Sequence, residues 1–273
     1  MGNFSLLISV YKKDNPIWLK EAFDCIFAQT IQPDEIVLVK DGPLTQDLED
    51  IIEDNVKAHP IFKFVINENN LGLGLALRKG VMACKNEIIA RMDSDDLMPN
   101  DRFEKQFNVL NSDIDVVSCW SLLFENKVDD VVAIKKRPEL HSDIVKLAHK
   151  RSPVCHAACF MRRSAVIKAG NYIDRQFYED YNLWVRMILS GATFYNIQEP
   201  LYFVRTDVNQ LKRRGGFKYL KKELKYLYEF KELGFYSFSD LLRNSFIRII
   251  ARLAPPFIRG MIFKKIWNHS SKY

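Results

Sequence analysis

Two apolar patterns alternate along the N-terminal part of the chain. Short apolar runs typical of buried strands occupy 4–10, 35–40, 62–66 and 87–92. Segments with apolar residues at helical spacing follow each run, at 16–29, 47–57, 73–84 and 99–110. Strands that alternate with helices predict an α/β fold, with a mostly parallel sheet wound by right-handed crossovers and helices on both faces.

The pattern is less regular from residue 111 to residue 210. Strand-like runs occur at 116–124, 131–134, 155–161, 192–197 and 201–204. Helical spacing occurs at 142–149, 164–169 and 179–190, and Gly191 follows the last of these as a stop signal. We expect this mixed half to complete the same domain, so that residues 1–210 form one unit.

The segment 211–273 has a different character. Lysines and arginines are interleaved with apolar and aromatic residues at helical spacing over 217–231, 241–253 and 258–267, with Pro255-Pro256 as a break. Such helices either pack as a lid on the main domain or lie on a membrane surface. For 217–231 both interpretations stay open, and for 241–267 the membrane is favoured.

Charge is divided unequally along the chain. Residues 211–273 carry 15 Lys and Arg against 4 acids, whereas the rest of the chain carries 25 against 30. The net charge of +6 therefore comes from the C-terminal segment, which predicts contact with an anionic surface. The regularly spaced Phe, Ile and Trp residues in this segment fit lipid better than nucleic acid.

Composition limits the classes of protein to which the chain can belong. A chain of 273 residues with 48% hydrophobic residues can build a full core. We expect no signal peptide, because Met1 leads directly into a strand pattern, and no spanning helix, because every apolar run is too short to cross a bilayer. The five cysteines are odd in number, and Cys155 and Cys159 lack a second pair for zinc, which indicates free thiols in a reducing cytoplasm.

An acidic cluster follows the strand 87–92. Asp93, Asp95 and Asp96 stand where this strand ends, at the edge where open α/β sheets bind their ligands. Like charges at this spacing repel one another unless a cation lies among them. Oxygen ligands suit Mg²⁺ or Mn²⁺, which usually also bind substrate phosphates. The alternative is a solvated acidic turn.

Three further groups accompany the cluster. Val10 and Tyr11 leave the first strand, and Asp41 leaves the second strand before a glycine. A carboxylate at that edge can accept from a base or a ribose, although Asp-Gly is also common turn chemistry. Glu179 and Asp180 open the helix 179–190, where they either favour the helix dipole or supply a general base.

In this order, the motifs resemble the family 2 glycosyltransferases, which are inverting enzymes of the GT-A fold with a Rossmann-like sheet. The resemblance covers about residues 4–205. It rests on segments 8–11, 28–30, 33–42 and 70–74, on Asp93-Ser94-Asp95-Asp96 and on Glu179-Asp180. Segment 33–42 with Lys212-Arg213-Arg214-Gly215-Gly216 is similar to the bacterial branch that builds O-antigen, capsule and exopolysaccharide, including amylovoran.

The resemblance implies a nucleotide-sugar half over about 1–97. Asp41 would contact uracil or ribose, and Val10 and Tyr11 would line the nucleobase pocket. Asp95 would bind the metal directly, and Asp93 would bind ribose, the metal or its water. Asp96 would orient the donor sugar.

An acceptor half over about 98–210 is implied as well. Asp180 would be the catalytic base, with Glu179 as its neighbour or an acceptor contact. His156 would lie on the acceptor side, although a core histidine fits the sequence equally well. Arg205 would reach the diphosphate, for which its forked donors are suited. The basic run 212–214 would close over the diphosphate or face lipid phosphates.

The implied activity moves a hexose from UDP-galactose or UDP-glucose to a sugar on polyprenyl (undecaprenyl) diphosphate, with a β linkage and with Mn²⁺ or Mg²⁺. Segment 211–273 would hold the protein peripherally on the cytoplasmic face of the bacterial inner membrane. A non-catalytic scaffold with the same fold is the alternative. A nucleotidyltransferase is disfavoured, because no glycine-rich loop follows the first strand.

Overall fold

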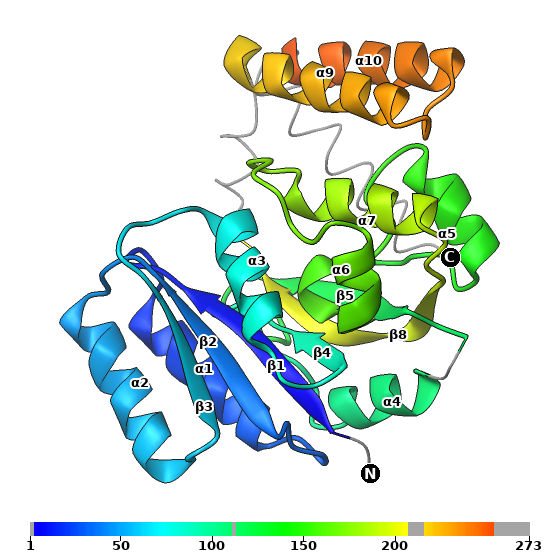
Figure 1. The fold of residues 1–273 in the computed structure, drawn as a ribbon. Helices are drawn as coiled ribbons and strands as arrows, with labels where there is room; N and C mark the ends of the chain where they lie inside the picture. The colour runs from blue at the N-terminus through cyan, green and yellow to red at the C-terminus, as the bar shows by residue number, and fades with distance from the viewer. Residues whose placement is uncertain (1–2, 111–112, 207–215, 254–273) are drawn as a thin grey trace.

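A single eight-stranded sheet organises the chain in a computed structural model, which describes residues 3–110, 113–206 and 216–253 (Figure 1). The strand order is β3-β2-β1-β4-β7-β5-β6, and β8 also pairs with β5. The first four strands are β1 (Phe4–Val10), β2 (Glu35–Asp41), β3 (Phe62–Asn67) and β4 (Ile88–Arg91). Their pairings with one another are all parallel, which confirms the predicted α/β architecture.

Parallel pairing brings the carboxyl ends of three strands to one edge. Val10 pairs with Lys40 across β1 and β2, and Leu7 pairs with Arg91 across β1 and β4. The residues at these strand ends include Tyr11 after β1, Asp41 as the last residue of β2, and the acidic turn after β4. Strands placed side by side therefore assemble segments that lie far apart in the sequence.

Helices cover both faces of the sheet. On one face, α1 (Pro16–Phe27) and α2 (Gln46–Ala58) pack against alternate side chains of β1 such as Leu6 and Ile8. On the other face, α3 (Leu73–Ala83), α6 (Arg163–Lys168) and α7 (Glu179–Leu189) pack against Leu7 and its neighbours. The continuous apolar runs of the sequence thus reflect strands that are buried on both sides.

The second half completes the sheet with antiparallel and parallel strands. Its elements are α4 (Arg102–Val109), β5 (Val116–Phe124), β6 (Val131–Lys135), α5 (His141–Ala148), β7 (Phe160–Arg162) and β8 (Phe194–Arg205). β7 runs antiparallel to β4 and to β5, whereas β8 runs parallel to β5.

Two predictions about this half were wrong. Residues 155–161 do not form one strand, because His156–Ala158 form a 3₁₀ turn before the short strand β7. The hydroxyl of Ser118 satisfies both the N–H and the carbonyl of Cys155, so the backbone there needs no neighbouring strand. The two short strands expected at 192–197 and 201–204 are one strand, β8. Its pairing with β5 shifts register around Pro200, which lacks an N–H to donate.

The C-terminal segment forms a helical hairpin above α7 (Figure 1). Helices α9 (Phe217–Glu232) and α10 (Phe238–Leu253) confirm the expected helical character, although α10 begins three residues before the predicted start. Aromatic residues join α9 and the turn after it to α7, including Tyr181, Phe230 and Tyr236. The helix expected at 258–267 lies outside the described residues.

Helix α9 therefore packs on the main domain, as the lid interpretation expects, whereas α10 carries exposed apolar side chains on its outer face. The membrane interpretation of the segment stays a prediction. Among the described residues, no helix combines the length and the hydrophobicity needed to cross a bilayer. All five cysteines are free thiols, as predicted.

Candidate active site

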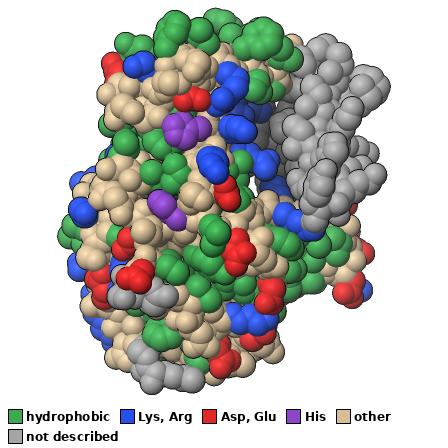
Figure 2. All heavy atoms as spheres, turned by 90° about the vertical axis from the view of Figure 1, so that its right-hand side faces the viewer, with side chains coloured by type: hydrophobic (Ala, Val, Ile, Leu, Met, Phe, Trp, Pro, Cys, Tyr) green, Lys and Arg blue, Asp and Glu red, His purple; other side chains and the backbone are tan. Residues whose placement is uncertain are grey.

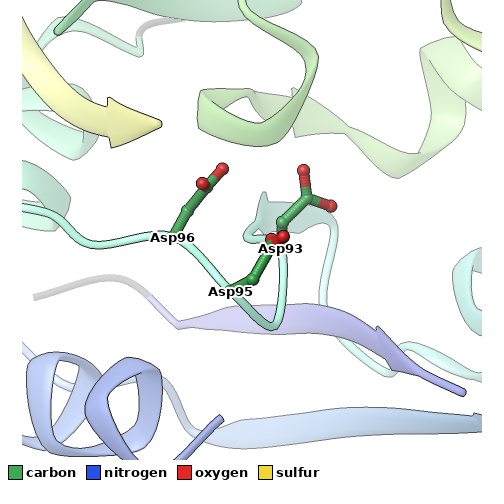
Figure 3. Close-up of side chains that lie close together, drawn as sticks. All are labelled: Asp93, Asp95 and Asp96. Carbon is green, nitrogen blue, oxygen red and sulfur yellow. The ribbon is translucent and has the colours of Figure 1, made fainter. Parts of the chain in front are cut away.

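The acidic turn after β4 brings three carboxylates together (Figure 3). Asp93, Asp95 and Asp96 each offer an oxygen atom within 4.8 Å of the others. The guanidinium of Arg91, the last residue of β4, forms an ion pair with Asp93 and is only 2% exposed. One buried cation thus stands beside three carboxylates, which leaves the cluster with an excess of negative charge.

Burial and repulsion between neighbouring carboxylates raise the pKa values of Asp95 and Asp96. Burial raises the pKa of Asp95 to about 7, and the carboxylates of Asp93 and Asp14 add to the rise. The pKa of Asp96 is raised well above its ordinary value by burial and by the carboxylates of Asp95 and Asp93. A hard divalent cation would relieve this repulsion, and oxygen-only ligands are the set that such a cation prefers. The residues present therefore fit a divalent metal.

Asp14 is a fourth carboxylate that the sequence analysis missed. Its Oδ2 accepts a hydrogen bond from Ser94 Oγ at 2.8 Å, which ties it to the acidic turn. Burial raises the pKa of Asp14 to about 6. Asp14 follows β1 closely, and β1 lies next to β4 in the sheet. Finding Asp14 would have required the order of the strands in the sheet, which the local sequence pattern does not reveal.

A pocket of about 370 Å³ opens beside this turn. Its walls come from the ends of β1, β2 and β4, and they include Ser9, Tyr11, Asp41, Asn70, Asp93 and Asp95. Tyr11 is 39% exposed, whereas Val10 is fully buried in the core behind it. Of the predicted nucleotide-sugar residues, Tyr11, Asp41 and Asp93 line this pocket, whereas Val10 supports its wall from behind and Asp96 and Arg205 are not among the lining residues. We call this cavity the donor pocket.

Asp41 both lines the donor pocket and organises its rim. Its carboxylate accepts hydrogen bonds from the backbone N–H groups of Leu71 and Gly72 at 2.9 and 3.0 Å, and from Asn67 Nδ2 at 2.9 Å. A Cβ atom at Gly42, where φ is +91°, would lie 2.8 Å from the nitrogen of Asn70. The turn interpretation and the binding interpretation of Asp41 are therefore compatible, because the turn forms part of the pocket wall.

Arg205 lies behind the acidic turn. Its backbone N–H donates to Asp96 Oδ1 at 2.8 Å, and its Nε donates to the carbonyl of Asp95 at 3.1 Å. The guanidinium also binds Glu21 at 2.6 Å and stacks on Trp18. Arg205 thus fixes the turn against the end of β8, and it is not among the residues that line the donor pocket. Its expected contact with a diphosphate stays a prediction.

A second pocket, of about 380 Å³, contains the other predicted acids. Glu179 and Asp180 lie in the first turn of α7, and both line this cavity. Ser152 Oγ donates to Asp180 Oδ2 at 3.0 Å. Burial raises the pKa of Asp180, and burial together with Asp180 raises the pKa of Glu179 to about 7. We call this cavity the acceptor pocket. An ionised, partly desolvated Asp180 has the properties of a general base.

Comparison with known proteins identifies the family. The model of the family described as "Glycosyl transferase family 2" matches residues 5–170. The chain belongs to this family. A UDP-Gal:alpha-D-GlcNAc-diphosphoundecaprenol beta-1,3-galactosyltransferase of Escherichia coli is 37% identical over 265 residues, which cover 96% of each chain. The amylovoran biosynthesis glycosyltransferase AmsE of Erwinia amylovora is 34% identical and covers 96% of this chain and 98% of its own.

Solved structures place this family 2 glycosyltransferase in the GT-A fold. A mannosyltransferase from Pyrobaculum calidifontis, in complex with GDP-Man and Mn²⁺, superposes with a TM-score of 0.64 at 13% identity, covering 99% of this chain and 76% of that one. TarS 1–349 of S. aureus, in complex with UDP-GlcNAc, gives 0.62 at 12% identity, covering 94% and 69%. At these identities the likeness concerns the fold alone.

Arg91 links the two pockets of this family 2 enzyme. Burial lowers its pKa, but the neighbouring Asp93, Tyr202, Tyr172 and Asp96 together outweigh burial, and the net shift is upward. The same guanidinium also lowers the pKa of Glu179 and of Asp180. Its Nε is buried and has no hydrogen-bond partner among the described residues. A charged residue inside the apolar run 87–92 was the available signal, and the sequence analysis did not use it.

His156 is half-buried and lies near Arg91. Its Nε2 is 2.8 Å from the hydroxyl of Tyr172. Burial lowers the pKa of His156 well below its usual value, and the nearby Arg91 adds to that effect, so the ring is neutral. The structure therefore shows a half-buried histidine whose partner is a tyrosine hydroxyl, which differs from the core histidine that the sequence analysis kept as an alternative. A direct acceptor contact by His156 stays a prediction.

Proposed function

We propose that this glycosyltransferase transfers galactose or glucose from a UDP-sugar to a sugar carried on polyprenyl diphosphate. The observation that carries the proposal is the pair of pockets whose carboxylates both interact with Arg91. One pocket is crowded with carboxylates that need a cation, and the other holds a carboxylate suited to accept a proton. The E. coli relative named above, which uses UDP-Gal and a diphosphoundecaprenol-linked GlcNAc, supports this choice of substrates.

The donor pocket would hold the nucleotide sugar. Tyr11 offers an exposed ring for the base, and Asp41 lies where a carboxylate can meet the base or the ribose. Asp95 and Asp93 would hold Mn²⁺ or Mg²⁺, which when bound supplies positive charge against the leaving diphosphate. Asp96, held by the backbone of Arg205, would orient the donor sugar.

The acceptor pocket would supply the base. Asp180 takes the proton from the attacking hydroxyl, while Ser152 holds its second oxygen in place. The hydroxyl oxygen forms a bond to the anomeric carbon as the bond to the UDP oxygen breaks. A single displacement inverts the anomeric centre, so an α-linked UDP-sugar gives a β linkage. The mechanism needs no second, nucleophilic carboxylate.

The outer face of α10 supports a peripheral membrane location. Seven apolar side chains on this helix are between 38% and 65% exposed, namely Phe238, Leu242, Phe246, Ile247, Ile249, Ile250 and Leu253. Figure 2 shows hydrophobic side chains over the layer that α9 and α10 form, with Lys and Arg side chains gathered beneath it. Apolar burial and roughly 1 kcal/mol for each basic residue near the surface would favour an anionic bilayer. We place the enzyme on the cytoplasmic face of the inner membrane, where UDP-sugars are made.

One assay tests the proposed activity. Purified protein is incubated with a panel of UDP-sugars and a synthetic GlcNAc-diphosphate-lipid acceptor, with Mn²⁺ or with EDTA. We expect a disaccharide product with UDP-Gal or UDP-Glc in the presence of Mn²⁺, and no product in EDTA or with Asp95→Asn. A folded wild-type protein that forms no product with any donor would contradict the proposal and favour the scaffold alternative.

Flotation with liposomes tests the location. A double substitution of Phe246→Ser and Ile250→Ser should release the protein from vesicles that contain anionic lipid, without disturbing the buried contacts of α10. Deletion of the helix would be a poorer test, because it would also remove Arg252, the partner of the buried Glu223. Unchanged flotation of the double variant would rule out the outer face as the binding surface.

A further inference from the structure

The wall of the acceptor pocket opposite α7 is formed by arginines of the C-terminal hairpin. Arg248 and Arg252 lie on α10 and line the same cavity as Glu179 and Asp180. The outer face of α10 is apolar and exposed, whereas these two residues lie on its inner face with the buried Asn244. The hairpin therefore does more than cover α7, because it adds positive charge beside the proposed base.

The two arginines are not equivalent. Arg252 donates to both oxygens of Glu223, at 2.7 and 2.8 Å, and stacks over Tyr219. Glu223 is fully buried and also accepts from the hydroxyl of Tyr178. Arg248 Nε lies 3.9 Å from Glu223 Oε1, which is too far for a hydrogen bond. The Glu223 carboxylate thus faces the guanidinium groups of Arg248 and Arg252, and its hydrogen bonds go to Arg252.

No described residue accepts a hydrogen bond from Arg248, and its side chain is 22% exposed. The Arg248 guanidinium also lies near that of Arg151. Its positive charge contributes to lowering the pKa of Arg151. The inner face of α10 thus carries two arginines at the pocket, and the carboxylate that faces both of them, Glu223, is hydrogen-bonded to Arg252. The forked donors of Arg248, which form no hydrogen bond with a described residue, match the oxygens of a phosphate.

Phe177 supplies a second, independent observation. This residue has a φ of +73°, which is rare for a bulky side chain and costs conformational energy. Its ring is 55% exposed on the pocket wall, and its centroid lies 5.5 Å from that of Tyr219. A strained backbone that holds an aromatic ring in solvent indicates a binding role, because core packing does not account for it. Flat aromatic surfaces suit the C–H faces of a sugar.

We infer that the acceptor pocket binds a sugar 1-diphosphate, with the sugar on Phe177, its attacking hydroxyl toward Asp180 and its diphosphate on Arg248. This inference rests on the proposed function and specifies which part of the acceptor the C-terminal hairpin recognises. Arg252 acts as a positioning residue, since its pairing with Glu223 fixes α10 over the pocket. One helix therefore presents phosphate-binding donors on its inner face and apolar side chains on its outer face, which suits a substrate whose diphosphate joins a sugar to a lipid.

The test compares two soluble acceptors in detergent without phospholipid, one a GlcNAc-α-diphosphate with a short alkyl chain and the other the neutral alkyl α-glycoside of GlcNAc. In Arg248→Gln, the KM for the diphosphate acceptor should rise at least about tenfold, because charge-assisted hydrogen bonds are lost. The rate with the neutral acceptor and the KM for the UDP-sugar should stay unchanged. Arg248→Lys, which keeps the charge without the fork, should fall between wild type and Arg248→Gln. Lys225→Gln, which removes one exposed charge from α9, is the matched control and should behave as wild type.

Other outcomes would overturn the inference. An equal loss with both acceptors would indicate a structural role for Arg248, and a raised KM for the UDP-sugar would assign it to the donor. An unchanged preference for the diphosphate acceptor, with a loss only in vesicle binding, would assign it to phospholipid headgroups. In all three cases the wild-type enzyme still transfers sugar, so the proposed function stands. A wild type that is inactive with both acceptors would instead refute the proposed function, and this inference with it.

Discussion

The two pockets differ in how they balance charge. In the donor pocket, Asp14, Asp93 and Asp95 converge at the ends of parallel strands, with Arg91 as the buried cation beside them. In the acceptor pocket, Glu179 and Asp180 face the arginines of α10 across the cavity. The first pocket is incomplete without an added cation, whereas the second carries its own cations.

That difference follows from the way each pocket is built. The donor pocket comes from the parallel half of the sheet, where crossovers bring similar strand ends to one edge. The acceptor pocket comes from the N-terminus of α7 and from a hairpin that follows only after β8. Metal dependence should therefore belong to the donor pocket, and acceptor recognition to the C-terminal hairpin.

The largest effect should come from Asp180→Asn. Removing the proposed base should lower kcat by roughly 10²–10⁴-fold, because an amide cannot take the proton of the acceptor hydroxyl. Binding of UDP and Mn²⁺, measured by calorimetry, should stay within about twofold of wild type, since the donor pocket is intact. Retention of more than a tenth of the wild-type kcat would show that another group acts as the base.

Asp95→Asn should separate activity from stability. Transfer should be lost, but the metal-free protein should unfold at a temperature about 2–4 °C higher, equivalent to about 1 kcal/mol of relieved repulsion. The folded-state pKa of Asp95 is raised to about 7. The metal-free wild type therefore loses stability as the pH rises from the ordinary aspartate value toward 7, and the variant should lack that slope.

Calorimetric melts in EDTA and in Mn²⁺ measure this effect. Mn²⁺ should raise the unfolding temperature of wild type and leave that of Asp95→Asn nearly unchanged. Destabilisation of the metal-free variant would mean that Asp95 has a structural role that the cluster geometry does not show.

Arg91→Met removes the buried cation that interacts with carboxylates of both pockets. We expect a loss on the order of 3 kcal/mol in the free energy of unfolding in EDTA, because the carboxylates lose their buried partner. Mn²⁺ should restore part of that loss by taking over the charge. Arg102→Met is the matched control, because Arg102 is equally buried but binds Gln106 and a backbone carbonyl. Equal restoration of both variants by Mn²⁺ would exclude a special role for Arg91.

The smallest effect should come from Ser152→Ala, as a shift in the pH profile of kcat. At saturating Mn²⁺, kcat should rise with pH through the raised pKa of Asp180, because only the ionised carboxylate accepts a proton. Ser152 lowers that pKa by donating a hydrogen bond. Ser152→Ala should therefore move the acidic limb to higher pH by less than one unit. A shift to lower pH would contradict the role of Ser152 at the ionised base.

Periodicity in the sequence was sufficient to predict the parallel half of the fold. Buried strands followed by amphipathic helices place Asp41 and the acidic turn at the correct edge. Asp14 was missed because its position depends on the neighbour of β1 in the sheet. The turn at His156–Ala158 was missed because the hydroxyl of Ser118, which is distant in the sequence, replaces a strand partner there.

The acceptor pocket was predictable only in part. Glu179-Asp180 stood out as a pair at a helix start, but the residues opposite them come from the segment 241–267, for which the sequence analysis favoured a membrane surface. Burial of Arg252 against Glu223, and the position of Arg248 beside them, depend on tertiary packing of α10. A lysine- and arginine-rich helix can turn some of its charges inward, and sequence spacing does not reveal which ones.

The anomeric configuration of the product tests the central claim most directly. The account predicts that NMR of the disaccharide formed with Mn²⁺ from an α-linked UDP-sugar will show a β linkage only, because a single displacement at the anomeric carbon, with Asp180 as the base, inverts the centre. A product with an α linkage would require two displacements or attack from the same face as the leaving group, and would contradict the proposed role of Asp180 as a general base.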